Sequence, residues 1–112
     1  MRERECRPIV NGRADGLCER CGHPGRLTLH HRVKRSQGGP WTPQNCVMLC
    51  GHGTLGCHGW VEHNPNAAAD EGFHVRPWNS PAEVPVLYRG RWVLLDDLGD
   101  TYRIPTPAGG VA

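Results

Sequence analysis

Residues 18–58 read CERCGHPGRLTLHHRVKRSQGGPWTPQNCVMLCGHGTLGCH, and this stretch holds most of the chain's cysteines and histidines. Its first cysteine pair, Cys18 and Cys21, has the two-residue spacing that tetrahedral zinc sites favour. The second pair, Cys50 and Cys57, is separated by six residues, of which three are glycines that allow a tight loop. We expect the four cysteines to bind one structural Zn²⁺ and to join the two ends of the stretch.

Because the spacer between Cys50 and Cys57 is long, the identity of one zinc ligand is left open. His52 could replace Cys50, and Cys46 offers a further thiol four residues before Cys50. Cys46 lies among apolar residues, where a small buried side chain is expected, so we leave it out of the site. Buried free thiols or a disulfide pair would also account for the cysteines.

The composition explains why a metal is needed. The chain has 112 residues, enough for one small domain, and Leu, Ile, Val and Phe together occupy only 21 positions. Ordering the backbone costs about 1–2 kcal/mol per residue, which so thin a core does not offset. A net charge of only +2 does not indicate disorder. Zinc binding, at about 10–16 kcal/mol in small domains, would make up the difference.

Two classes of protein are excluded by the distribution of apolar residues. No run of 18 apolar residues is present, so we expect no membrane span. The first six residues, MREREC, are charged and lack the apolar stretch of a secretory signal. We therefore expect a cytoplasmic protein, in which cysteines bind metal more often than they form disulfides. A disulfide-stapled secreted domain would also leave the histidines unexplained.

The pattern of apolar and turn-forming residues predicts a small α+β domain. Residues 27–31 and 45–50 are expected to form two antiparallel strands, joined by the turn-rich loop 36–43. A helix is expected over residues 58–63 and is expected to restart at Asn64-Pro65, because Asn caps helices and Pro suits the first helical position. The predicted order is therefore strand, loop, strand, helix.

The flanking segments predict further secondary structure. Residues 85–88 and 91–95 have the pattern of a β-hairpin with Arg89-Gly90 in its turn. A short helix is expected within residues 2–16, although Pro8 interrupts it with a turn signal. We divide the chain into an N-terminal arm (1–17), a metal-stapled core (18–74) and a C-terminal β extension (75–112).

Two adjacent histidines, His30 and His31, end the first predicted strand. Neighbouring side chains in a strand point to opposite faces, so one can bind a metal while the other faces a substrate. His58 directly follows a predicted zinc ligand and is therefore held rigidly. Hydrolysis of a phosphodiester needs a divalent ion and a base whose pKa is near neutral, and histidine serves both purposes.

Positive charge is concentrated in the first half of the chain. Arg32, Lys34 and Arg35 follow the histidine pair and are expected to contact phosphates, although a solvated charged loop is the alternative. Trp41 could stack on a base, but anchoring its loop is the favoured role. The other three tryptophans are expected to pack in the small core, and they are Trp60, Trp78 and Trp92.

This stretch resembles the HNH endonucleases, whose fold is a ββα-metal (His-Me) finger. The resemblance covers 41 of 112 residues and rests on elements that occur in the family's order. The elements are Cys18-x2-Cys21, His30-His31, Arg35-Ser36-x-Gly38-Gly39, Thr42-Pro43-x-Asn45, Leu49-Cys50 and Cys57-His58. It implies a ββα-metal finger with a Cys₄ zinc site, which here carries a C-terminal β-hairpin extension. In its compact size and in the Gly-Trp that follows His58, the chain is similar to HNH proteins of bacteriophages.

The resemblance also implies roles for individual residues. His30 and His58 would bind a catalytic divalent ion, which could be Mg²⁺, Mn²⁺, Ni²⁺ or Zn²⁺. His31 would be the general base, and Asn45 would hold the loop of that base in place. Some relatives carry a third ligand four residues after the last histidine. Glu62 occupies that position here and His63 the next, so both stay candidates.

The expected function is metal-dependent hydrolysis of double-stranded DNA, with nicking by a monomer. Similarity to phage proteins adds a link to DNA packaging, a terminase as a partner and the bacterial host cytoplasm as a location. The alternative is a non-catalytic, zinc-stabilised nucleic-acid-binding module. That alternative predicts that His30, His31 and His58 are replaceable.

Overall fold

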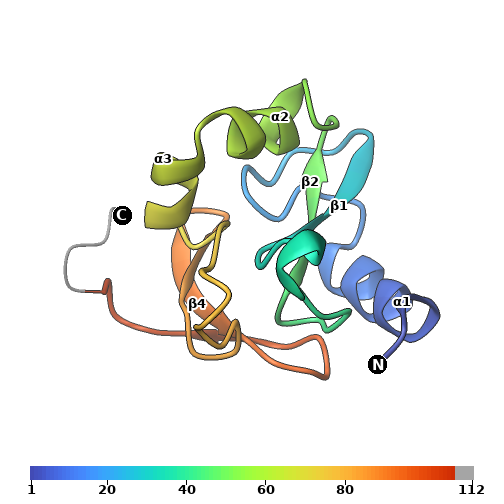
Figure 1. The fold of residues 1–112 in the computed structure, drawn as a ribbon. Coiled ribbons are helices and arrows are strands. Elements are labelled where there is room, and N and C mark those ends of the chain that lie inside the picture. Colours follow the sequence, from blue (N-terminus) through green and yellow to red (C-terminus); the bar gives the residue numbers. More distant parts are fainter. Residues whose placement is uncertain (108–112) are drawn as a thin grey trace.

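The computed structural model describes residues 1–107, so residues 108–112 of the expected C-terminal extension lie outside the described part. Figure 1 shows α1 and the β1–β2 pair on one side of the molecule, with α3 and the β4 sheet on the other. The mixed arrangement confirms the predicted α+β class. The elements are α1 (Glu3–Ala14), β1 (Leu27–His31), the 3₁₀ turn η1 (Arg35–Gln37), β2 (Cys46–Cys50), α2 (Gly56–His63), α3 (Pro65–Asp70), β3 (Val86–Tyr88), β4 (Arg91–Leu95) and β5 (Thr101–Arg103).

The predicted strand pair is confirmed. β1 and β2 are antiparallel, and their register places His30 opposite Val47 and His31 opposite Cys46. Four of the five residues of β2 are buried, because α1 and α2 both pack against this strand. The two strands and α2 form the ββα unit that carries the histidines (Figure 1).

The C-terminal hairpin is also confirmed. β3, β4 and β5 form an antiparallel sheet, and Arg89 and Gly90 in the first turn both have positive φ angles, of 50° and 83°. Two-residue hairpin turns that follow strand twist require such angles. Val86 and Val93 of this sheet share one core with Val47 of β2. The C-terminal strands therefore cover the core of the ββα unit.

The N-terminal helix forms in spite of its local turn signals. α1 continues through Pro8 and buries Cys6, Val10 and Ala14, which repeat every four residues along one face. This face packs against Met48 of β2. Burial of the apolar stripe therefore outweighs the helix-breaking residues.

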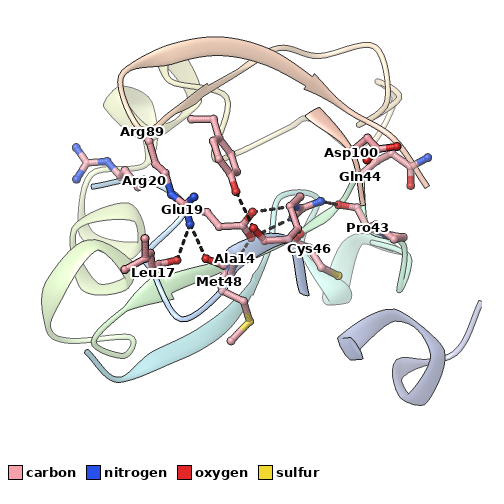
Figure 2. Close-up of polar contacts among 12 residues, drawn as sticks. Ala14, Leu17, Glu19, Arg20, Pro43, Gln44, Cys46, Met48, Arg89 and Asp100 are labelled. Carbon is pink, nitrogen blue, oxygen red and sulfur yellow. Dashed lines mark hydrogen bonds and ion pairs between the residues drawn. The ribbon is translucent and has the colours of Figure 1, made fainter. Parts of the chain in front are cut away.

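A buried polar network ties α1 to the rest of the chain. The Arg13 guanidinium pairs with Glu19 at 2.6 Å, and Glu19 accepts a hydrogen bond from the Met48 backbone at 2.9 Å. Figure 2 shows Arg89 reaching from the C-terminal sheet to the end of α1, where it donates to the carbonyls of Ala14 (2.7 Å) and Leu17 (2.9 Å). The N-terminal arm, the segment Leu17–Cys21, β2 and the C-terminal sheet are thus held together.

The break between α2 and α3 agrees only in part with the prediction from the sequence. Pro65 begins α3 as expected, but the Asn64 side chain donates to the Trp60 carbonyl at 3.0 Å and does not cap the helix. Gly72 follows the end of α3 with φ 83°, and a Cβ there would lie 2.0 Å from the Pro85 carbonyl.

No helix in the described part of the chain is both long enough and apolar enough to cross a membrane.

Candidate metal centres

The four predicted cysteines lie together. Their sulfur atoms, from Cys18, Cys21, Cys50 and Cys57, are all within 4.8 Å of one another. Four thiols at such distances suit a tetrahedral Zn²⁺. His52 lies outside the group, because its Nδ1 contacts Thr54 Oγ1 at 3.0 Å.

Two glycines allow the six residues between Cys50 and Cys57 to fold so that both cysteines join the cluster. Gly51 and Gly56 have φ angles of 81° and 65°, which favour glycine. A Cβ on Gly51 would lie 2.2 Å from the Leu55 carbonyl, and one on Gly56 would lie 2.5 Å from the Cys50 carbonyl. The loop therefore folds back tightly and brings Cys50 beside the start of α2.

Hydrogen-bond donors surround the thiols. The backbone N–H groups of Arg20 and Cys21 approach Cys18 Sγ at 3.4 and 3.5 Å, and the N–H of Cys57 approaches Cys50 Sγ at 3.3 Å. Burial raises the pKa of Cys18, but the donors outweigh burial and bring that pKa to about 7. The thiolate, which is the form that binds metal, is therefore favoured at this cysteine.

Arg20 is a residue at the four-cysteine cluster that the sequence analysis did not single out. Its guanidinium donates to Cys57 Sγ at 3.3 Å and to the Glu71 carboxylate at 2.8 Å. It also lies 3.8 Å from the ring centre of Trp60, in a cation–π contact. Arg20 thereby links the Cys18–Cys21 segment to α2 and to the end of α3, and no pattern near Arg20 in the sequence indicated these contacts.

His30, His58 and Glu62 form a second cluster, whose ligand atoms lie within 4.8 Å of one another. His30 Nδ1 is 3.3 Å and His58 Nε2 is 3.7 Å from the same Glu62 oxygen. His58 and Glu62 share one face of α2 because four residues separate them. His63, the other candidate, faces elsewhere and contacts the Gly59 carbonyl through Nδ1 at 2.8 Å.

Hydrogen bonds fix which nitrogen of each imidazole faces Glu62. His30 Nε2 lies 2.6 Å from the Phe73 carbonyl, which only accepts, so Nε2 carries a proton and Nδ1 is the nitrogen that faces Glu62. Thr28 donates its hydroxyl proton to the Gly51 carbonyl at 2.9 Å, so it accepts from His58 Nδ1 at 2.6 Å. His58 Nε2 is then free to face Glu62. Such outer partners are typical of metal-binding histidines.

The charges in this cluster also suit a divalent cation. Hydrogen bonding with His30 lowers the pKa of Glu62 to about 2, so the carboxylate is ionised at neutral pH. Burial lowers the pKa of His58, and the neighbouring His30 lowers it further, which favours the neutral imidazole. Two imidazoles and one carboxylate are a donor set that binds Zn²⁺, Ni²⁺ and Mn²⁺.

His31 has surroundings different from those of His30. Its ring lies edge-on to Trp41, with centroids 4.4 Å apart, and Arg35 and Arg7 lie over the same indole at 5.1 and 5.6 Å. Burial, followed by the charge of Arg35, lowers the pKa of His31 to about 4. The imidazole is therefore neutral at pH 7 and has a lone pair that can accept a proton, but its pKa lies below the near-neutral value expected of the base. Arg7, on α1, was not singled out from the sequence.

Asn45 closes the loop that follows His31. Its side chain accepts from the Val33 N–H at 2.7 Å and donates to the carbonyls of Val33 and Pro40 at 3.1 Å. Asn45 is fully buried, so these bonds are shielded from water. The loop from Val33 to Pro40 is thus pinned at both ends.

The expectation that Arg32 contacts phosphate is wrong. Arg32 is fully buried, and its backbone N–H donates to the Asn45 carbonyl at 2.7 Å. Its guanidinium donates four hydrogen bonds at 2.7–3.0 Å, to the carbonyls of Gly72, Gln44, Pro81 and Val84. Arg32 therefore cross-links the fold, while Lys34 and Arg35 are exposed.

A comparison with protein families agrees with this geometry. Residues 18–59 match the family model described as HNH endonuclease. Among curated proteins and among solved structures, no match to the chain was found. The matched segment contains the four cysteines, His30 and His58, whereas Glu62 lies just beyond its end.

Proposed function

We propose that the HNH domain at residues 18–59, completed by Glu62, hydrolyses DNA phosphodiester bonds with a divalent ion held by His30, His58 and Glu62. One observation carries the proposal. Both imidazoles are fixed by outer hydrogen bonds so that one nitrogen of each faces the same ionised carboxylate. The three ligand atoms lie within 4.8 Å of one another, which is a donor set that a divalent ion can bind.

Each residue of the site has a separate task in this reaction. His30, His58 and Glu62 would hold a divalent ion, which would supply positive charge toward the phosphate and the departing oxygen. His31 takes the proton from the attacking water, and Nδ1 is the nitrogen for this step because Nε2 is buried. Asn45 keeps the following loop in place through Val33 and Pro40.

The exposed cations of the pinned loop are proposed to position the DNA. Lys34 and Arg35 lie within the segment that Asn45 closes, so phosphate contacts there would be held at a fixed distance from His31. A single site cuts one strand, so we expect a monomer to nick. A phage origin, a terminase partner and a location in the host cytoplasm remain expectations from the resemblance.

Conversion of supercoiled plasmid to open circle tests the proposal. Zinc-loaded protein is assayed with added Mg²⁺, Mn²⁺ or Ni²⁺ and without any added ion. We expect His58→Ala to lose at least about 100-fold in rate, because loss of even an outer partner of a metal ligand typically costs 10–100-fold. His63→Ala is the matched control, since His63 lies on the same helix outside the cluster.

Two results would contradict the nuclease. One is equal nicking by His58→Ala and His63→Ala. The other is folded, zinc-loaded wild type that binds DNA in a salt-sensitive way but cuts it with none of the ions. The second result would favour the non-catalytic binding module.

A further inference from the structure

A pocket of about 340 Å³ lies beside the His30–His58–Glu62 cluster. His74 forms part of its wall, and the ring centre of His74 is 5.3 Å from that of His30. His74 is not itself one of the clustered ligands, because its Nε2 donates to the Val61 carbonyl at 2.9 Å. The pocket therefore begins one side chain away from a metal ligand.

The chemistry of the wall suits part of a polyanion. Lys34 and Arg76 are exposed cations at the pocket, and buried Arg32 lies behind it. No Asp or Glu lines the pocket within residues 1–107. Apolar and amide groups complete the wall, among them Val75, Val84, Gln37, Asn66 and Asn79. Such a mixture offers apolar contact for a flat ring and hydrogen bonds for its polar edge.

Trp78 stands at this pocket with 78% of its surface exposed, so the expectation that it packs in the core is wrong. The Asn79 N–H donates to the Arg76 carbonyl at 3.0 Å and closes a turn that presents Pro77 and Trp78. The Val75 N–H donates to the Arg32 carbonyl at 2.9 Å, which fixes the start of this turn. The indole is therefore held in solvent by a well-anchored segment.

We propose that this pocket takes one unpaired nucleobase of the DNA strand that the domain cuts, with Trp78 as its stacking surface. The inference rests on the proposed nuclease function and names the substrate that suits it. Lys34 and Arg76 would contact the flanking phosphates. A base in a duplex is stacked on its neighbours, so only an unpaired or flipped base can enter. The volume lies at the lower end of the roughly 300–1,000 Å³ of small-ligand sites, which fits a single base.

Binding of a fluorescein-labelled octathymidylate, followed by anisotropy, tests the pocket. The measurement uses zinc-loaded His31→Ala protein, in which we expect the oligonucleotide to stay intact. Adding Trp78→Ala is expected to weaken binding about tenfold, within the range that single base-stacking aromatics contribute. Trp78→Phe should retain most of the affinity, and Tyr102→Ala, which removes an exposed aromatic of β5, should bind as the parent does. A fully paired duplex should lose less than about twofold with Trp78→Ala, because its bases are already stacked.

The outcomes separate the pocket from the nuclease. Unchanged octathymidylate binding by Trp78→Ala would overturn the pocket, even if the wild type nicks plasmid. Equal losses for octathymidylate and duplex would also overturn it, because Trp78 would then contact DNA without taking a base. A third outcome is that Trp78→Ala weakens octathymidylate binding while wild-type protein cuts plasmid with none of the ions. That outcome would support the pocket and refute the nuclease.

Discussion

A Cys57→Ser variant is expected to lose its folded state together with its zinc. Cys18 and Cys57 are buried in the same cluster as Val47 and Leu49, so two of the four predicted zinc ligands are part of this core. Structural zinc contributes about 10–16 kcal/mol in small domains, whereas a whole domain is stable by only about 5–15 kcal/mol. Removal of one ligand therefore removes a stabilisation comparable to the total.

Circular dichroism during heating, with zinc content measured on the same sample, checks this expectation. Cys6→Ala is the matched control, because Cys6 is a fully buried cysteine that packs in the second core, outside the four-cysteine cluster. It should retain zinc and lose about 1–2 kcal/mol, as core truncations commonly do. A zinc-free Cys57→Ser protein that still melts cooperatively at the wild-type temperature would show that the site is not structural.

A His31→Ala variant is expected to lose roughly 10²–10⁴-fold in cleavage rate, which is the usual contribution of a general base. The zinc content of this variant and its affinity for the catalytic divalent ion should not change. His31 belongs neither to the four-cysteine cluster nor to the His30–His58–Glu62 cluster. Single-turnover nicking of plasmid at saturating protein isolates the cleavage step from DNA binding.

His52→Ala is a suitable control for this variant, since the His52 side chain hydrogen-bonds to Thr54 in its own loop and is not a member of the His30–His58–Glu62 cluster. It should nick at the wild-type rate. A His31→Ala rate equal to that of His52→Ala, in folded and zinc-loaded protein, would rule out His31 as the base.

The ββα order and the membership of the cysteine site could be predicted because they depend on local spacing. The residues next to His30 show the limit of prediction from local spacing. Strand alternation separates His30 from His31, and the same alternation places Arg32 with His30 on the inner side. Charge alone groups Arg32 with Lys34, whereas in the structure Arg32 is buried and donates to four carbonyls of segments distant in the sequence.

Contacts between distant segments account for the other differences. The role of Arg20 depends on Glu71, which is 51 residues away, and the exposure of Trp78 depends on a turn anchored at the Arg32 carbonyl. α1 persists through Pro8 because its apolar face meets β2. No local pattern carries these contacts, whereas the spacing of four between His58 and Glu62 did indicate the third member of the cluster.

The placement of the catalytic ion is tested most directly by the rate of plasmid nicking as a function of Mn²⁺ concentration, for zinc-loaded wild type and Glu62→Gln. Glutamine keeps the size of the side chain but removes the charge that faces both imidazoles. We expect wild-type nicking to rise with Mn²⁺ and saturate, and Glu62→Gln to need at least about tenfold more Mn²⁺ for half its maximal rate. Identical Mn²⁺ dependence of the two proteins would contradict a catalytic ion at His30, His58 and Glu62.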